Sequence, residues 1–374
     1  MTAVLVIGAG IAGSAAAIAL ARGGVEVDIV ESTSRDDHHG SGITLQGNAL
    51  RVLRQLGLWA EVSASGYGFD TLGIRAPDPS GTLLVEMPDA RTGGPDLPAT
   101  LGMERPALAT ILHEAAERAG AKIRFDTRVT ALTQDGSGVD ATLSDGSTHR
   151  YDVVIGADGV RSWTRKEIGI EAHIRPTGMG IWRFVGPRPE SVTRTDLVYG
   201  GVGYIAGYCP TGDDSLYAYI VEDAQDRTAL TDSEKLSVLR DLSSHYHGPW
   251  DDIRKNLLDT VSVNYTWFES HVLEGNWHRG RVVLIGDAAH SCPPTLAQGA
   301  AQALEDAQVL TELLLSADTI DDSVFERFVA RRSPRAREVV EASVQLGAWM
   351  LDGVRDADVP GLMGRIAHLV SVPA

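Results

Sequence analysis

Short apolar runs and helix-favouring stretches alternate at the start of the chain, and this pattern predicts a mixed α/β protein. Residues 3–7 form an apolar, β-branched run, residues 14–23 are rich in alanine, and residues 25–30 form a second apolar run. A strand, a helix and a strand in this order indicate buried parallel strands joined by a helix. Apolar runs within residues 152–159 and 280–287 have the same character. We therefore predict a three-layer arrangement around a mostly parallel sheet.

A second pattern fills the middle of the chain, where polar and apolar residues alternate and aromatic residues are frequent. Residues 176–270 show this strand-like alternation, interrupted by a helical stretch near residues 233–245. Residues 71–100, rich in Gly, Pro, Asp and Thr, add a further sheet segment. This predicts a smaller α+β domain of mainly antiparallel sheet, interlocked with the first domain and followed by C-terminal helices. The predicted nucleotide-binding domain comprises residues 1–70, 101–175 and 275–345, the second domain comprises residues 71–100 and 176–274, and residues 346–374 form a C-terminal helix.

Local signals place several helix boundaries. Asn48 is a predicted N-cap, Gly57 is the stop of the same helix, and Pro106 fits the first turn of another helix. Pro334 is expected to kink the helix that contains it. Further helices are predicted to start at residues 160–162 and to cover residues 298–315, 323–346 and 347–370.

The composition is that of an ordinary globular protein. Of its 374 residues, 43% are hydrophobic and 22% are charged, and no apolar run approaches the roughly 20 residues of a membrane helix. The formal net charge of −17 argues against nucleic acid or an anionic membrane as a partner. Cys209 and Cys292 lack metal-type spacing, so we expect neither a disulfide nor a zinc site. With the first strand beginning almost at Met1, we predict a cytoplasmic monomer or homodimer without stable membrane association.

Candidate chemistry begins after the first strand, where Gly8, Gly10 and Gly13 fit a G-x-G-x-x-G pattern. In its setting of strand, turn, helix and strand, this pattern is typical of dinucleotide binding. Gly8 permits the tight turn, Gly10 lets the backbone approach a pyrophosphate, and Gly13 lets the helix pack closely on the strand. The pyrophosphate is expected at the helix N-terminus. Glu31 is placed to accept hydrogen bonds from a ribose 2′-hydroxyl, which favours FAD or NAD over NADP at this site.

A polar loop offers an alternative site, because two aspartates and two histidines adjoin at residues 36–39. Such residues can bind a metal, but neighbours in one loop rarely build a closed coordination shell. A solvated loop is the favoured interpretation.

Two later strand ends carry motifs of their own. Asp158-Gly159 follows one buried strand, and residues 286–290 (GDAAH) follow another. With all three motifs in this order, the chain resembles, over nearly its whole length, the single-component (group A) flavoprotein aromatic hydroxylases, whose archetype is para-hydroxybenzoate hydroxylase. The resemblance implies that the first motif and Glu31 bind the ADP part of FAD. It also implies that the second motif contacts FAD and a transient NADH or NADPH, and that Asp287 meets the ribityl chain of FAD.

The resemblance extends beyond these motifs. It implies that residues 41–43 lie along the flavin and that Arg105 faces it, while Ala297 and Ala301 replace a glycine and an asparagine usual in the family. Gly299 is expected to open a helix whose N–H groups and dipole face the negative charge of a reduced flavin. The predicted cofactor contacts are Gly8, Gly10, Ile11, Ala12, Gly13, Glu31, Ser32, Arg35, Ser41, Gly42, Ile43, Arg105, Val129, Asp158, Gly159, Arg161, Gly286, Asp287, Ala289, Gly299 and Ala300.

The activity that the resemblance implies is that of an FAD-dependent monooxygenase. NAD(P)H reduces a tightly but non-covalently bound FAD, O2 adds to form a C4a-hydroperoxide, and its distal oxygen passes to a small phenolic or heteroaromatic substrate. A polar pocket residue is expected to act as a base or proton relay. An arginine facing the ring favours a carboxylated or phenolate substrate. The pocket candidates are Arg183, Tyr199, Tyr204, Tyr208, Tyr217 and Pro294, whereas His290 is expected to be structural.

Other activities fit the same motifs. An epoxidase or a Baeyer–Villiger-type enzyme has the same fold, and a flavin oxidase or a non-catalytic FAD-binding protein shares the nucleotide site. A flavin halogenase has a related fold, but its Trp-x-Trp signature and its catalytic lysine in context are missing from this sequence. Oxygen uptake driven by NAD(P)H and by an aromatic substrate distinguishes the monooxygenase from the oxidase and from the binding protein.

Overall fold

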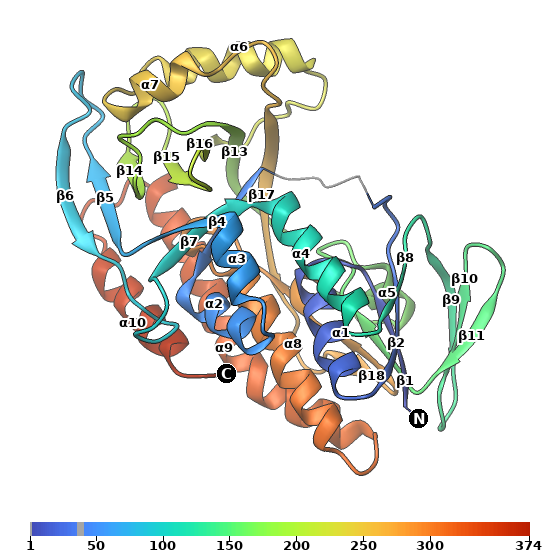
Figure 1. Cartoon of the computed structure of the whole chain (residues 1–374). Helices are drawn as coiled ribbons and strands as arrows, with labels where there is room; N and C mark the ends of the chain where they lie inside the picture. Colours follow the sequence, from blue (N-terminus) through green and yellow to red (C-terminus); the bar gives the residue numbers. More distant parts are fainter. Residues whose placement is uncertain (1, 36–40) are drawn as a thin grey trace.

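The computed structural model describes residues 2–35 and 41–374, and its first layered unit is built on a six-stranded sheet (Figure 1). All neighbouring strands in this sheet are parallel except the edge strand β18, which runs antiparallel to β19. The predicted mostly parallel sheet is therefore confirmed. In spatial order the strands are β18 (His278–Arg279), β19 (Val282–Leu284), β12 (Val153–Gly156), β1 (Ala3–Ile7), β2 (Glu26–Val30) and β8 (Lys122–Arg124).

Helices and a small sheet cover this central sheet. Ala15, Ala16 and Ala17 of α1 are fully buried, and their small side chains let the helix lie close to its neighbours. At the end of α1, a Cβ on Gly23 would lie 2.4 Å from Leu315 of α8, so the two helices approach closely there. The covering elements are α1 (Ile11–Arg22), α4 (Arg105–Arg118), α5 (Trp163–Glu167) and α8 (Gly299–Ser316), with the antiparallel sheet of β9 (Val129–Gln134), β10 (Val139–Leu143) and β11 (Thr148–Tyr151).

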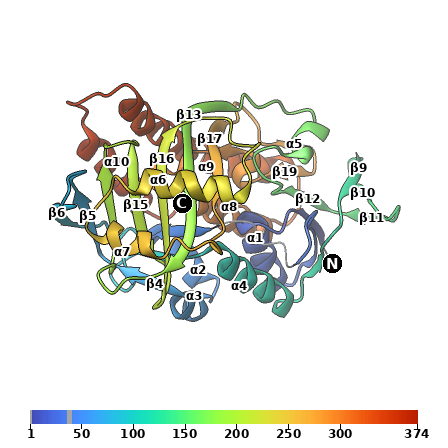
Figure 2. The ribbon, with the colours of Figure 1, turned by 90° about the horizontal axis from the view of Figure 1, so that it is seen from above.

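An eight-stranded sheet forms the second unit, and α6 and α7 lie across one of its faces (Figures 1 and 2). Fully buried Trp182 from the sheet and Trp250 from α7 belong to the core between them. Every strand pair in this sheet is antiparallel except β14 with β5. The elements are β20 (His290–Ser291), β17 (Asn264–Val272), β13 (Arg175–Pro187), β16 (Ser215–Asp223), β15 (Ile205–Pro210), β14 (Thr195–Tyr199), β5 (Thr71–Arg75), β6 (Leu83–Pro88), α6 (Asp232–Ser243) and α7 (Pro249–Lys255).

The two units are joined by more than the chain connections. Strand β20 begins at His290, the last residue of the third motif, and it pairs with β17 of the eight-stranded sheet, Val272 opposite His290. A small sheet lies where the units meet, and the long C-terminal helices follow α8 (Figure 1). Its strands are β3 (Gly42–Gln46), β7 (Thr100–Glu104) and β4 (Gly66–Phe69), and the remaining helices are α2 (Gly47–Gln55), α3 (Trp59–Ser65), α9 (Asp322–Leu351) and α10 (Val359–Ser371).

Several predicted boundaries are wrong. Helix α2 begins at Gly47, so Asn48 lies inside it and is not its N-cap. Helix α5 begins at Trp163, after its N-cap Ser162, and not at residue 160. Helix α9 runs through Pro334 and Gly347 to Leu351 as one element. The short helices α3 and α7 were not predicted.

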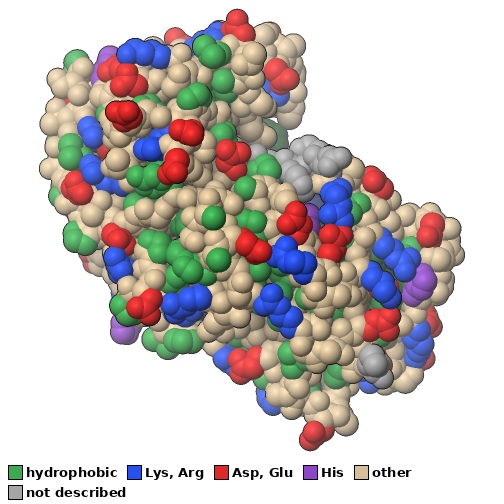
Figure 3. Space-filling model, viewed as in Figure 1, with side chains coloured by type: hydrophobic (Ala, Val, Ile, Leu, Met, Phe, Trp, Pro, Cys, Tyr) green, Lys and Arg blue, Asp and Glu red, His purple; other side chains and the backbone are tan. Residues whose placement is uncertain are grey.

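The surface carries charged side chains of both signs. On the face seen in Figure 3, acidic and basic side chains are interspersed. No helix in the described ranges is both long and apolar enough to cross a membrane. Both cysteines are free.

Candidate active site

The turn between β1 and α1 separates the roles of its three glycines. Gly8 has a φ of +104°, and a Cβ there would lie 2.5 Å from the carbonyl oxygen of Ala157. A Cβ on Gly13 would lie 2.0 Å from the carbonyl oxygen of Gly8. Beside Gly10, by contrast, no described atom lies within 4 Å of the Cβ position. Gly8 and Gly13 are therefore needed for packing, while Gly10 borders open space at the N-terminus of α1, where a pyrophosphate would bind.

Glu31 stands at the end of β2 beside this turn. Its Oε2 accepts a hydrogen bond from the Ala9 N–H at 2.9 Å, and its Oε1 accepts from the Thr33 N–H at 3.0 Å and the Ser32 hydroxyl at 3.2 Å. Burial raises the pKa of the Glu31 carboxyl, but these hydrogen bonds outweigh it and hold the pKa below its usual value. The Oε1 atom also accepts from the Thr33 hydroxyl at 3.1 Å, so the fixed carboxylate has Oε2, with its single donor, left to accept from a ribose hydroxyl.

Two of the predicted contacts near Glu31 are engaged elsewhere. Arg35 forms an ion pair with Glu117, and its guanidinium lies 4.7 Å from the centre of the Phe125 ring. Val129 begins β9 and its side chain is buried in the core. Neither arrangement by itself indicates a cofactor contact.

The second motif supports the start of α5. Asp158 Oδ2 accepts hydrogen bonds from the Thr164 N–H at 2.8 Å and from the Thr164 hydroxyl at 2.9 Å, and its Oδ1 accepts from the Ser162 hydroxyl. Gly159, with a φ of +81°, borders open space. Arg161 is an exposed residue that pairs with Glu269 of β17 at 2.9 Å. The Asp158 side chain thus fixes the loop, and Gly159 leaves its outer side open.

Arg165, which was not predicted from the sequence, links the second and third motifs. This buried arginine donates to the carbonyl oxygen of Ala288 at 2.8 Å and to that of Val160 at 2.9 Å. Nothing in the local pattern distinguishes it from an ordinary surface arginine of a helix. Only the tertiary structure shows that it spans the two cofactor motifs.

Asp287 in the third motif is held open for a ligand. It makes no hydrogen bond with any described residue, and its side chain is solvent-accessible. Burial by the surrounding protein nevertheless raises the pKa of its carboxyl, while the positive charges of His290 and Arg105 oppose that rise.

Arg105 opens α4 opposite Asp287. Its N–H donates to the carbonyl oxygen of Ser41 at 3.1 Å, whereas its guanidinium has no hydrogen-bond or ion-pair partner among residues 2–35 and 41–374. Its charge acts on both Asp287 and Tyr217. The unpaired arginine therefore lies between the third motif and the eight-stranded sheet.

The loop before α8 completes this side of the site. Pro294 is exposed, and Ala297 has left-handed backbone angles, with a φ of +52° and a ψ of 32°. Gly299 begins α8, and a Cβ there would meet nothing within 4 Å. The N-terminus of α8 thus presents its N–H groups beside the open space at Gly299, and its contact with an anionic ring system stays a prediction.

The face of the eight-stranded sheet opposite α6 and α7 supplies the other wall. Arg183 and Tyr219 are direct cross-strand partners, and the Arg183 Nη1 donates to the Thr266 hydroxyl at 2.5 Å. The rings of Tyr217 and Tyr219 lie 5.2 Å apart. Tyr217 also packs on β3, because a Cβ on Gly42 would lie 2.3 Å from its side chain. This cluster of Arg183, Tyr217, Tyr219 and Thr266, here called the sheet cluster, therefore borders the predicted flavin-lining strand.

The other predicted pocket tyrosines lie apart from the sheet cluster or at its margin. Tyr208 points to the opposite face, where it is buried against Trp250 and donates to Asp196 at 2.8 Å. The Tyr204 hydroxyl donates to Asp223 at 2.6 Å, and this bond raises its pKa to about 12. Tyr199 lies at the edge of the cluster, 39% exposed, and burial on its other sides raises its pKa. Tyr219 and Thr266 were not predicted.

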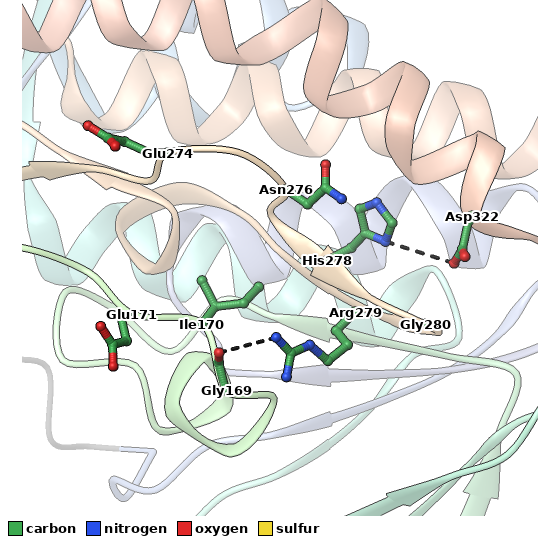
Figure 4. A pocket seen from close by; sticks show the side chains of 9 residues that line it. All are labelled: Gly169, Ile170, Glu171, Glu274, Asn276, His278, Arg279, Gly280 and Asp322. Atoms are coloured by element: carbon green, nitrogen blue, oxygen red, sulfur yellow. Dashed lines mark hydrogen bonds and ion pairs between the residues drawn. The ribbon is translucent and has the colours of Figure 1, made fainter.

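A separate hollow of about 550 Å³ lies away from these residues (Figure 4). In it, Arg279 donates to the Gly169 carbonyl oxygen at 3.3 Å, and buried His278 lies 4.0 Å from Asp322. None of the predicted site residues lines it. The described ranges hold no group of three His, Cys, Asp or Glu side chains that could bind a metal, and residues 36–39 lie outside them.

The arrangement around the three motifs fits an FAD molecule. Open space adjoins Gly10, Gly159 and Gly299, a fixed carboxylate at Glu31 is placed for a ribose, and Asp287 is free to accept hydrogen bonds. Residues 41–43 connect these cofactor-motif residues, here called the motif row, to the sheet cluster through the contact between Gly42 and Tyr217. FAD bound along this row would bring its ring system between Arg105 and the sheet cluster.

Comparison with known proteins identifies relatives over nearly the full length. A family model described as an FAD binding domain matches residues 1–343. A 2-heptyl-3-hydroxy-4(1H)-quinolone synthase of Pseudomonas aeruginosa is 32% identical over 353 residues, which cover 92% of this chain and 90% of that protein. A 6-hydroxynicotinate 3-monooxygenase of Bordetella bronchiseptica is 29% identical over 350 residues, covering 91% and 90%.

Solved structures agree with these matches. The tetrameric form of 2-methyl-3-hydroxypyridine-5-carboxylic acid oxygenase superposes with a TM-score of 0.81 at 26% sequence identity. The superposition covers 98% of this chain and 96% of that one.

Proposed function

The chain belongs to the FAD-binding domain family of flavin-dependent monooxygenases, and we propose that this member hydroxylates a small phenolic or heteroaromatic ring bound as an anion. It is an FAD-dependent, NAD(P)H-using enzyme. When bound, FAD supplies the chemistry that takes electrons from NAD(P)H and activates O2. The protein supplies binding, orientation and exclusion of water.

The sheet cluster is the observation that supports a substrate bound as an anion. The Arg183 guanidinium provides a positive charge, and the Tyr217 phenol provides a donor beside it. Burial raises the pKa of Tyr217, although Arg183 and Arg105 oppose that rise, so Tyr217 is a protonated donor near neutral pH. The cluster contains no carboxylate. Arginine pairs well with phenolates and carboxylates, which favours an anionic aromatic ring here.

These residues would prepare the ring for attack. Arg183 would hold the carboxylate of the substrate, or the oxyanion of a ring that has already lost its hydroxyl proton to solvent before it binds. The negative charge of such an oxyanion makes the ring more electron-rich. Tyr217 would keep its own proton and donate a hydrogen bond to the same oxygen. The packed rings of Tyr217 and Tyr219 would keep water from the reacting carbon.

Arg183 provides the direct test. In Arg183→Met, the substrate dissociation constant, measured from the change in the flavin spectrum, should rise at least about tenfold because one charge-assisted hydrogen bond is lost. Arg183→Lys should lose less, and FAD content should not change. Tyr208→Phe on the far face should lower the melting temperature without changing substrate affinity. Unaltered substrate binding in Arg183→Met would contradict the assignment.

The proposal also assigns a role to each of the two predicted domains. The proposed FAD-binding domain comprises residues 1–70, 101–175 and 275–345, and residues 71–100 and 176–274 bind the substrate. Helix α9 extends beyond residue 345, which supports placing the C-terminal boundary after Leu351. A cytoplasmic monomer or homodimer remains the prediction from composition.

A further inference from the structure

A buried carboxylate on α8 contacts the turn that contains Asp287. Asp306 is fully buried, and its Oδ2 accepts hydrogen bonds from the Gly286 N–H at 2.8 Å and from His290 Nε2 at 2.7 Å. Its Oδ1 accepts from Arg332 Nε of α9 at 2.7 Å. One side chain thus binds both ends of the turn that contains Asp287.

The turn itself has little freedom of its own. Gly286 has a φ of +58°, and a Cβ there would lie 3.0 Å from Ala12 of α1 and 3.4 Å from Ala303 of α8. The Gly286 N–H therefore bonds Asp306 in a place with little room for a side chain. Asp287 is the next residue, so this bond fixes the backbone beside it.

The charge of Asp306 is balanced from a distant part of the chain. Arg332 is completely buried and also donates to Glu305 Oε2 at 2.9 Å and to Gln302 Oε1 at 2.8 Å. Glu305 has a further partner in Arg335, at 3.1 Å. A buried ion pair can often be replaced by apolar residues of similar volume without loss of stability. What apolar residues cannot replace is the acceptor for Gly286 and His290.

We propose that Asp306 is a positioning residue for FAD, which fixes the turn that carries Asp287 and is itself held in place by Arg332. The proposal rests on the FAD-binding function of the family and adds two residues to its site. It also gives His290 a role, as a donor that orients Asp306 and not as an acid or base in the reaction.

A double variant separates positioning from stability. Asp306→Leu with Arg332→Met removes the acceptor and its counter-charge together. The apoprotein should therefore melt below wild type, because the donors at Gly286 and His290 are left unpaired, but above Asp306→Leu alone, which also leaves buried Arg332 with one carboxylate fewer. Its FAD dissociation constant, measured by flavin fluorescence, should rise about tenfold or more, the effect of losing one well-made hydrogen bond in the site. The visible spectrum of the bound flavin should change as well. The matched control is Glu312→Leu with Arg331→Met, which removes an exposed ion pair, 2.9 Å apart, between the same two helices. This control should change neither the FAD dissociation constant nor the spectrum of the bound flavin.

The outcomes are distinct. A folded double variant that binds FAD with wild-type affinity and spectrum would overturn the proposal. If that variant does not fold, Asp306→Asn serves instead. It keeps the volume but has one acceptor oxygen for three donors, so FAD affinity should fall several-fold, and unchanged affinity in the folded variant would again refute the positioning role. If the wild-type protein takes up no FAD, the assignment of FAD as the cofactor is wrong, and the proposal for Asp306 is wrong with it.

Discussion

At the scale of single residues, the glycines of the first motif show how one pattern serves two purposes. Gly13 is required by the fold, because a Cβ there would collide with the Gly8 carbonyl oxygen, whereas Gly10 borders open space. The close packing at Gly13 agrees with the sequence pattern, because strand, turn and helix fix the geometry of this unit, and the pyrophosphate contact at Gly10 stays a prediction.

This difference gives a paired prediction. Gly10→Ala should leave the free energy of unfolding of the apoprotein within about 0.5 kcal/mol of wild type, because its φ of −70° suits alanine. Its FAD affinity should fall by at least about tenfold, because the methyl group occupies the side from which a pyrophosphate approaches. Gly13→Ala should destabilise the apoprotein by more than about 3 kcal/mol. Urea titration of both apoproteins and flavin fluorescence provide the two measurements, and equal effects of the two substitutions would contradict the assignment of roles.

Side chains of the pocket were harder to predict than glycines. Alternation along β16 assigns Tyr217 and Tyr219 to one face, but the sequence does not say which face meets the cofactor. Tyr208 is an aromatic residue in a similar strand pattern, and only the pairing register places it on the face under α7. Arg165 and Asp306 were not predicted because their importance comes from partners more than fifteen residues away.

At the scale of elements, several boundaries were wrong. Residues 323–346 and 347–370 were predicted as two helices, but Gly347 lies inside α9, where a Cβ would make an ordinary packing contact with Met179 at 3.6 Å. The actual start of α10 has an N-cap in Asp358, which accepts from the Gly361 N–H at 2.9 Å. Asn48 carries a capping side chain that instead donates to Gln298 in the loop before α8. At Asn48 a tertiary contact therefore overrides a local preference, whereas the cap of α10 is local.

The loop before α8 contains a strained element that can be tested. Ala297 has a φ of +52°, a conformation that costs a residue with a Cβ about 1 kcal/mol and costs glycine little. Ala297→Gly should therefore raise the free energy of unfolding by roughly 0.5 kcal/mol, since part of the gain is lost to the greater freedom of glycine in the unfolded chain. FAD affinity should be equal or higher. A loss of stability in chemical denaturation would show that the loop is not strained at this residue.

At the scale of the whole molecule, the joint between the two sheets makes stability depend on pH. His271 of β17 is buried beside Arg165 and bonds the Ser291 hydroxyl at 3.0 Å across the β17–β20 pair. Burial, and then the charges of Arg165 and His290, lower its pKa from 6.5 to about 4. Between these two values the unfolded chain binds the proton and the folded one does not. Stability therefore falls as the pH drops through this window.

The corresponding experiment compares wild type with His271→Gln. From pH 7.5 to pH 5.0, the wild-type protein should lose on the order of 2 kcal/mol more unfolding free energy than the variant, at about 1.4 kcal/mol per pH unit below the unfolded pKa. Urea titrations at the two pH values measure the difference. Parallel losses in the two proteins would show that His271 is protonated in the folded state as readily as in the unfolded state.

The central claim is that this protein is an FAD-dependent aromatic hydroxylase, and anaerobic reduction of its flavin tests that claim most directly. The holoprotein would be mixed without oxygen with NADH or NADPH, alone and with phenols, hydroxybenzoates and hydroxypyridines. We predict that at least one anionic ring compound accelerates bleaching of the flavin about tenfold or more, and that later admission of O2 places one oxygen atom on that ring. A flavin that bleaches at the same rate with every compound, followed by no oxygen incorporation, would contradict the claim.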